Sequence, residues 1–153
     1  GRISTERTVN PMVFLKLVLG ACAVIVVLGL LWIRFAPIYK DSWHVTTRAE
    51  RDKAFMGGVI RFLPAAGKAE LEQLVSVVEQ APWTKHIAGD VEEGMLTYVT
   101  RTKVFGFPDF TTLWLSDAGL HIYARVRFGR VDFGVNKARI VDWLRKAGLE
   151  DTP

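Results

Sequence analysis

Residues 12–33, MVFLKLVLGACAVIVVLGLLWI, decide the architecture of this 153-residue chain. No charged residue occurs from 17 to 33, and Lys16 lies near enough to the start for its ammonium group to reach lipid headgroups. A helix of this length, rising about 1.5 Å per residue, would span roughly 33 Å, the thickness of a hydrocarbon core. We therefore expect one transmembrane helix over residues 11–36, ending before Pro37.

The segments on either side of this helix are polar. Residues 1–10 form a polar arm, and residues 37–53 form a charged juxtamembrane connector. Trp32, Tyr39 and Trp43 are placed as the aromatic belt of a membrane interface. Basic residues occur on both flanks, so the positive-inside rule does not decide which side of the membrane the rest of the chain faces.

The remaining residues, 54–150, have the patterns of one small soluble domain. Hydrophobic periodicity predicts strands over residues 54–63, 86–91, 95–104, 110–115 and 120–128, and helices over 67–80 and 137–147. A strand, a helix, four strands joined by tight turns and a final helix are typical of the α+β class. We therefore expect a mostly antiparallel sheet with two helices packed on it.

The charge of the chain is concentrated around the expected membrane helix. The formal net charge is +4, yet residues 37–153 hold 16 basic and 15 acidic side chains and contain no Lys/Arg run. Nucleic-acid binding is therefore not expected. The basic flanks of the helix suit anionic lipid instead.

The sequence offers few groups for catalysis. Cys22 is the only cysteine, which excludes an internal disulfide and a thiolate zinc site. The three histidines are dispersed and have no second ligand at metal spacing, and there is no phosphate-binding glycine loop and no serine-hydrolase elbow. We expect no metal, no cofactor and no catalytic residue, although Asp132 and Tyr123 would be the participants if the domain were an enzyme.

One strand pattern indicates a binding surface. The period of two in the strand over 120–128, and in its neighbour over 95–104, places cations on one face of each strand. The face so predicted holds Arg101, Lys103, Tyr123, Arg125 and Arg127. Like charges at cross-strand spacing repel each other, so an anionic ligand, a lipid phosphate, an acidic protein or an internal acid should compensate them. The internal candidates are Asp109 and Asp132, and pairing of Arg125 or Arg127 with Asp132 is the main alternative to ligand binding.

Residues 125–139, RVRFGRVDFGVNKAR, contain a turn before the last expected helix. Gly134 permits a positive φ at the helix entrance, and Asn136 is predicted to be the N-cap. Asp132 can pair with a neighbouring arginine. The residues to which we assign such fold-making roles are Asp109, Asp132, Gly134, Asn136 and Arg139.

This segment resembles the signature of DUF1499, an uncharacterised domain family whose members end in an arginine-rich strand, an Asp-x-Gly-x-Asn turn and a final helix. TYVTR at 97–101 and FGFPD at 105–109 resemble its second motif. RFAP at 34–37, followed by WHV at 43–45, resembles the start of alphaproteobacterial members just after their anchor. Val126 departs from the pattern, because the family usually has a small hydroxyl residue there. The resemblance implies an envelope-facing domain and no particular activity.

The leading interpretation is a non-enzymatic, single-pass membrane accessory protein that docks on or stabilises a larger membrane protein complex. From the resemblance we expect a bacterial inner-membrane location, with the N-terminus cytoplasmic and the domain periplasmic. Two alternatives stay open. The domain is a binding module that holds an anionic ligand, such as a lipid headgroup, on its cationic face, or it is an enzyme of unknown class.

Overall fold

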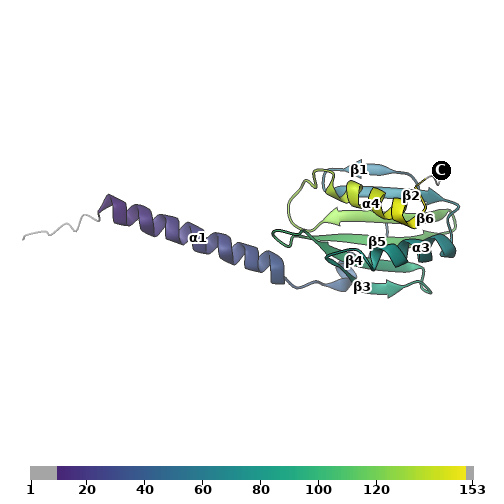
Figure 1. Ribbon diagram of the computed structural model, residues 1–153, viewed down its shortest axis with the longest axis horizontal. Coiled ribbons are helices and arrows are strands. Elements are labelled where there is room, and N and C mark those ends of the chain that lie inside the picture. Colours follow the sequence, from purple (N-terminus) through teal and green to yellow (C-terminus); the bar gives the residue numbers. More distant parts are fainter. Residues whose placement is uncertain (1–9, 151–153) are drawn as a thin grey trace, which may run out of the picture. The chain divides into compact units, whose positions relative to one another are not determined.

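The computed structural model describes residues 10–150. The chain divides into two compact units after Ala36, an apolar helix and a folded domain (Figure 1). The polar arm predicted over residues 1–10 lies, apart from Asn10, outside the described residues.

The first unit is helix α1, Pro11–Phe35, which is 25 residues long. The Asn10 side chain caps it by accepting a hydrogen bond from the Met12 N–H at 2.9 Å, and proline occupies its first turn, where no N–H partner is needed. None of its side chains is buried, and an 18-residue window within it has a mean hydropathy of 2.7. By length and composition it is the one helix within residues 10–150 that could cross a membrane.

The second unit is a six-stranded antiparallel sheet in the order β1-β2-β6-β5-β4-β3. Its strands are β1 (Lys53–Phe55), β2 (Gly58–Pro64), β3 (Thr84–Asp90), β4 (Met95–Arg101), β5 (Pro108–Ser116) and β6 (Gly119–Val126). Its helices are the short α2 (Lys40–Trp43), α3 (Lys68–Val78) and α4 (Val135–Ala147). Figure 1 shows α3 and α4 side by side on one face of the sheet. The expected α+β class is confirmed.

The hydrophobic core lies between these two helices and the sheet. Helix α3 contributes residues at helical spacing, and alternate residues of the strands complete the layer, as the two periodicities require. The fully buried members include Leu63, Leu71, Leu74, Val78, Leu113, Leu120 and Ile122.

Two strands differ most from their predicted boundaries. The single strand expected over 54–63 is a hairpin, β1–β2, that turns at Met56 and Gly57. Glycine is required at Gly58, because a Cβ there would lie 2.1 Å from the Ala124 carbonyl oxygen. The strand expected over 95–104 stops at Arg101, where a turn begins.

The face of the sheet opposite the helices is crossed by residues 43–52, which we call the strap. Trp43 stacks on Phe110 of β5, with ring centroids 3.9 Å apart and planes inclined by 9°. Further hydrogen bonds join His44 to Thr97 at 2.9 Å, His121 to the Ala49 carbonyl at 3.2 Å, and the Phe62 N–H to Asp52 at 2.8 Å. Trp43, expected in an aromatic belt, is therefore packed into the folded domain.

Candidate functional site

Arg125 is the most buried arginine or lysine among the described residues, with only 6% of its surface exposed. Its guanidinium donates hydrogen bonds to the Thr112 hydroxyl at 2.9 Å, to the Tyr123 carbonyl at 3.0 Å, and to the Trp43 carbonyl. It also lies over the Tyr123 ring, 4.3 Å from the centroid. Arg125 thus links the strap to strands β5 and β6.

No carboxylate among the described residues forms a salt bridge with Arg125. Burial lowers the pKa of Arg125 to about 10, because the charged form loses its hydration. The guanidinium N–H groups donate to carbonyl and hydroxyl oxygens, which take the place of a carboxylate as hydrogen-bond acceptors. Arg125 is therefore a structural cation, and the alternative in which it pairs with Asp132 is wrong.

The five residues of the predicted cationic face do not form one open surface. Tyr123 and Arg125 come together, but the strap covers Arg125. Arg101 donates to the Gly106 carbonyl at 3.0 Å, and the Arg127 guanidinium lies 5.0 Å from the Phe128 ring centroid. Lys103 is exposed in the turn that follows β4.

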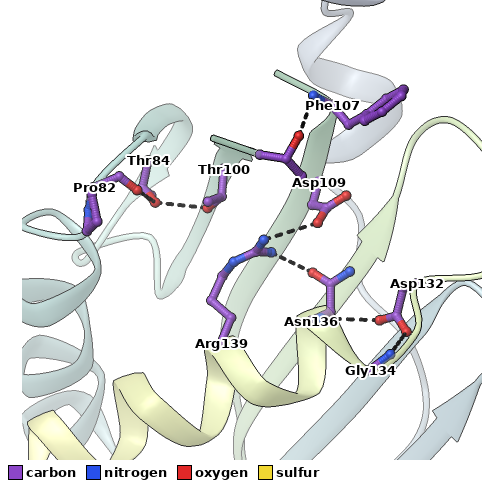
Figure 2. A network of polar contacts seen from close by, with 10 residues as sticks. Pro82, Thr84, Thr100, Phe107, Asp109, Asp132, Gly134, Asn136 and Arg139 are labelled. Carbon is purple, nitrogen blue, oxygen red and sulfur yellow. Dashed lines mark hydrogen bonds and ion pairs between the residues drawn. The ribbon is translucent and has the colours of Figure 1, made fainter. Parts of the chain in front are cut away.

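A second set of polar residues joins the last helix to the sheet (Figure 2). Arg139 of α4 donates to Asp109 of β5 at 3.1 Å and to the Asn136 side-chain oxygen at 2.7 Å. The side chains of Asp109 and Arg139 are 6% and 13% exposed, so the ion pair is largely buried. Burial raises the pKa of the Asp109 carboxyl, and the neighbouring Arg139 charge opposes that rise.

The predicted N-cap at Asn136 is wrong. Helix α4 begins at Val135, and Asn136 is inside its first turn and fully buried. The Asp132 carboxylate performs the capping instead, accepting from the Gly134 N–H at 2.7 Å and the Asn136 N–H at 3.3 Å. Gly134 has the expected positive φ, 78°. Its left-handed conformation turns the chain into the helix two residues earlier than the side-chain pattern indicated.

The loops at one end of the sheet gather exposed apolar side chains. Four loops lie at the same end of the sheet, on the left of the domain in Figure 1. They are the β1–β2 turn and the segments 81–83, 102–107 and 127–134. Strand pairing brings them together, because Gly58 pairs with Arg125, Arg101 with Pro108 and Thr84 with Thr100. We call this end the loop edge. Its exposed large apolar loop residues are Met56, Trp83, Val104, Phe105, Val131 and Phe133. None of them was singled out from the sequence.

A family model described as "Protein of unknown function (DUF1499)" matches residues 44–147. The chain belongs to the DUF1499 family. No curated protein and no solved structure matches it.

The DUF1499 match covers most of the strap, the whole sheet and the last two helices. The Arg125 cluster and the Asp109–Arg139 network therefore lie almost wholly within the family domain, with only Trp43 outside the match. Val126, where the resemblance had led us to expect a small hydroxyl residue, pairs with Asp109 across the β5–β6 ladder. This position is thus beside the buried ion pair.

The DUF1499 domain also has a groove of about 350 Å³ between α4 and the β1–β2 hairpin. Its lining is mostly apolar and also includes charged side chains. The lining includes Val59, Ile140, Val141, Leu144, Lys53 and Lys137.

The histidines of the DUF1499 domain make ordinary structural contacts. His121 hydrogen-bonds to the Ser116 hydroxyl at 2.7 Å and stacks on Trp114, and His86 contacts the Ala88 carbonyl at 2.9 Å. Within residues 10–150 no three His, Cys, Asp or Glu side chains come close enough together to hold a metal ion.

Proposed function

We propose that this DUF1499 protein is a single-pass membrane protein whose domain is a non-enzymatic accessory module that docks on or stabilises a larger membrane protein complex. In this proposal the N-terminus is cytoplasmic and the domain faces the periplasm of a bacterial cell. The observation that carries it is an apolar helix of 25 residues joined by only a few residues to a folded domain.

The connection between the helix and the domain is short. Seven residues separate Phe35, the end of α1, from Trp43, which stacks on Phe110. Even fully extended, that connection reaches about 29 Å. A membrane-inserted α1 would therefore keep the domain close to the bilayer and to neighbouring membrane proteins.

The charged residues within the DUF1499 match support a non-enzymatic role. Arg125 holds the strap, Arg139 and Asp109 hold the last helix on the sheet, and Asp132 caps that helix. Groups committed to the fold in this way are not available to bind or transform a substrate.

Membrane anchoring and complex formation can be tested on the full chain. We expect the protein to stay in the membrane pellet after alkaline carbonate washing, and to migrate after mild detergent extraction far above its own 17.2 kDa. A variant with Ile25→Glu, which places a charge in the middle of α1, is the control for anchoring. Release of the wild type by carbonate would contradict anchoring, and a monomer in every mild detergent would contradict the complex.

Topology can be tested with a single cysteine at Asp117, after Cys22→Ala. Asp117 is exposed in the β5–β6 turn, whereas its neighbour Ser116 is hydrogen-bonded to His121. A membrane-impermeant maleimide should label Asp117→Cys in intact spheroplasts. Labelling only after lysis would place the domain in the cytoplasm.

A further inference from the structure

The exposed apolar side chains of the domain are concentrated at the loop edge. Within residues 43–150, ten large apolar side chains are at least 36% exposed, and all of them except Val45 and Val141 lie at this end. Phe133 is 90% exposed and Val104 is 81% exposed. Scattered apolar residues are normal on a protein surface, but a cluster of this kind indicates a contact surface.

Two aromatic residues of the loop edge have a backbone conformation that glycine would adopt more easily. Phe133 has φ 52° and Trp83 has φ 60°, in the left-handed region that disfavours bulky side chains. Their rings are largely exposed, so packing inside the domain does not compensate for the strain. Strain of this kind, stored at an exposed position, indicates that the ring serves a contact outside the domain.

The loop edge is also basic. Its loops contain Lys103, Arg127 and Arg130, and their one acidic residue, Asp132, is occupied by two backbone N–H groups. The turns that join strands at the opposite end contain the acidic residues Glu92, Glu93 and Asp117, of which Glu92 pairs with Lys68 at 2.7 Å. The connecting loops therefore differ in charge between the two ends of the sheet, with apolar and basic groups at the loop edge and mainly acids in the opposite turns.

This combination matches an anionic bilayer surface. Aromatic and aliphatic side chains enter the headgroup region while lysine and arginine contact lipid phosphates. The strap adds a second reason, because Trp43, where the connector enters the fold, packs on Phe110, the third residue of β5 counted from the loop edge. The short connector thus joins the domain in the half of the sheet nearer these loops.

We propose that the loop edge is a membrane-docking surface that inserts Phe105, Phe133 and their apolar neighbours into an anionic bilayer, with Lys103 and Arg130 on the lipid phosphates. The inference rests on the proposed membrane anchoring and adds the orientation of the domain to it. The acidic end then faces away from the bilayer, and α3, α4 and the groove face sideways along the membrane.

The test uses the full chain in proteoliposomes, with Cys22→Ala and a single environment-sensitive label. Reporter cysteines replace Val104 or Val131 on the loop edge, and Asp117 at the opposite end. In vesicles of phosphatidylglycerol and phosphatidylcholine, we expect the fluorescence emission of the labels at 104 and 131 to shift to the blue. Nitroxide lipid labelled in its headgroup should quench both labels. The label at 117 should keep its aqueous emission.

Two sets of variants separate the apolar from the electrostatic contribution. Phe105→Ser with Phe133→Asn should abolish the shift at 104, and asparagine tolerates the left-handed backbone at 133. The matched control is Val141→Ser, an exposed apolar residue away from the loop edge. Lys103→Gln with Arg130→Gln should reduce quenching in phosphatidylglycerol vesicles, and salt should reduce it in the unmodified protein.

The outcomes distinguish this proposal from the one on which it rests. A chain that does not float with the vesicles refutes membrane anchoring itself. A chain that floats, but whose labels at 104 and 131 are quenched no more than the label at 117, refutes membrane docking by the loop edge. If those labels are then shielded only in native membranes, a protein partner covers this surface.

Discussion

Replacing Arg139 by methionine should strongly destabilise the domain. The change removes the cation that lies 3.1 Å from Asp109 while keeping most of the apolar length of the side chain. Asp109 is 4% exposed, so its carboxylate would be left buried without a partner. Loss of one member of a buried ion pair typically costs about 3–5 kcal/mol, several times the value of a surface pair.

The loss of stability caused by Arg139→Met should depend on pH in a defined direction. Burial already raises the pKa of Asp109 above its ordinary value, so the folded protein holds this proton in a pH range where the unfolded chain has released it. Stability therefore falls as the pH rises through that range. Without Arg139 the folded pKa rises further and the range extends upward. The loss caused by Arg139→Met should thus be smaller at about pH 5 than at about pH 8.

Urea unfolding of the full chain in detergent, followed by tryptophan fluorescence, measures both effects. A loss of about 3 kcal/mol would move the midpoint by roughly 1–3 M urea. Asp109→Asn in the same background should recover part of the loss. The matched control is Arg145→Met in the same helix, because Arg145 pairs with Asp142 on the surface and its removal should leave the midpoint unchanged. Equal midpoints for Arg139→Met and Arg145→Met, or a loss independent of pH, would refute a buried pair.

Four further changes test other parts of the structure. Gly134→Val should cost more than about 1 kcal/mol in urea unfolding, because its φ is 78° and no contact relieves the strain. Asp132→Ala should cost about 0.5–2 kcal/mol through loss of the cap. Arg125→Lys should speed tryptic cleavage after Arg48 in the strap, as seen by mass spectrometry. Burial lowers the pKa of His121. The histidine therefore favours folding above its unfolded pKa of about 6.5, and this contribution to stability is lost as the pH falls. His121→Gln should make the decrease of stability with falling pH shallower.

Much of the secondary structure could be predicted because its causes are local. An uncharged apolar run makes a helix in any context, and the period of two identified the strands and the helices between them. Gly134 was placed correctly because few residues other than glycine tolerate its backbone conformation. The hairpin at Gly57 and the true cap at Asp132 were missed, since each depends on the geometry of neighbouring chain segments.

The candidate site could be predicted only in part. Arg125 and Arg139 were identified as notable charges, but alternation along a strand says only which face a side chain takes. Whether that face is open to solvent depends on the strap, whose Trp43 precedes Arg125 of β6 by 82 residues in the sequence. Arg125, which was expected to bind an anionic ligand, is therefore a buried residue that holds the strap on the sheet.

The sequence by itself determined the apolar helix, the α+β class and the DUF1499 membership, since each depends on residue types at short and regular spacing. Only the tertiary structure decided which partners the charged residues have and which apolar residues remain exposed. Met56, Trp83, Phe105 and Phe133 are ordinary hydrophobic residues in four separate segments of the sequence. Antiparallel pairing brings the ends of those segments together, and this non-local geometry alone makes them one surface.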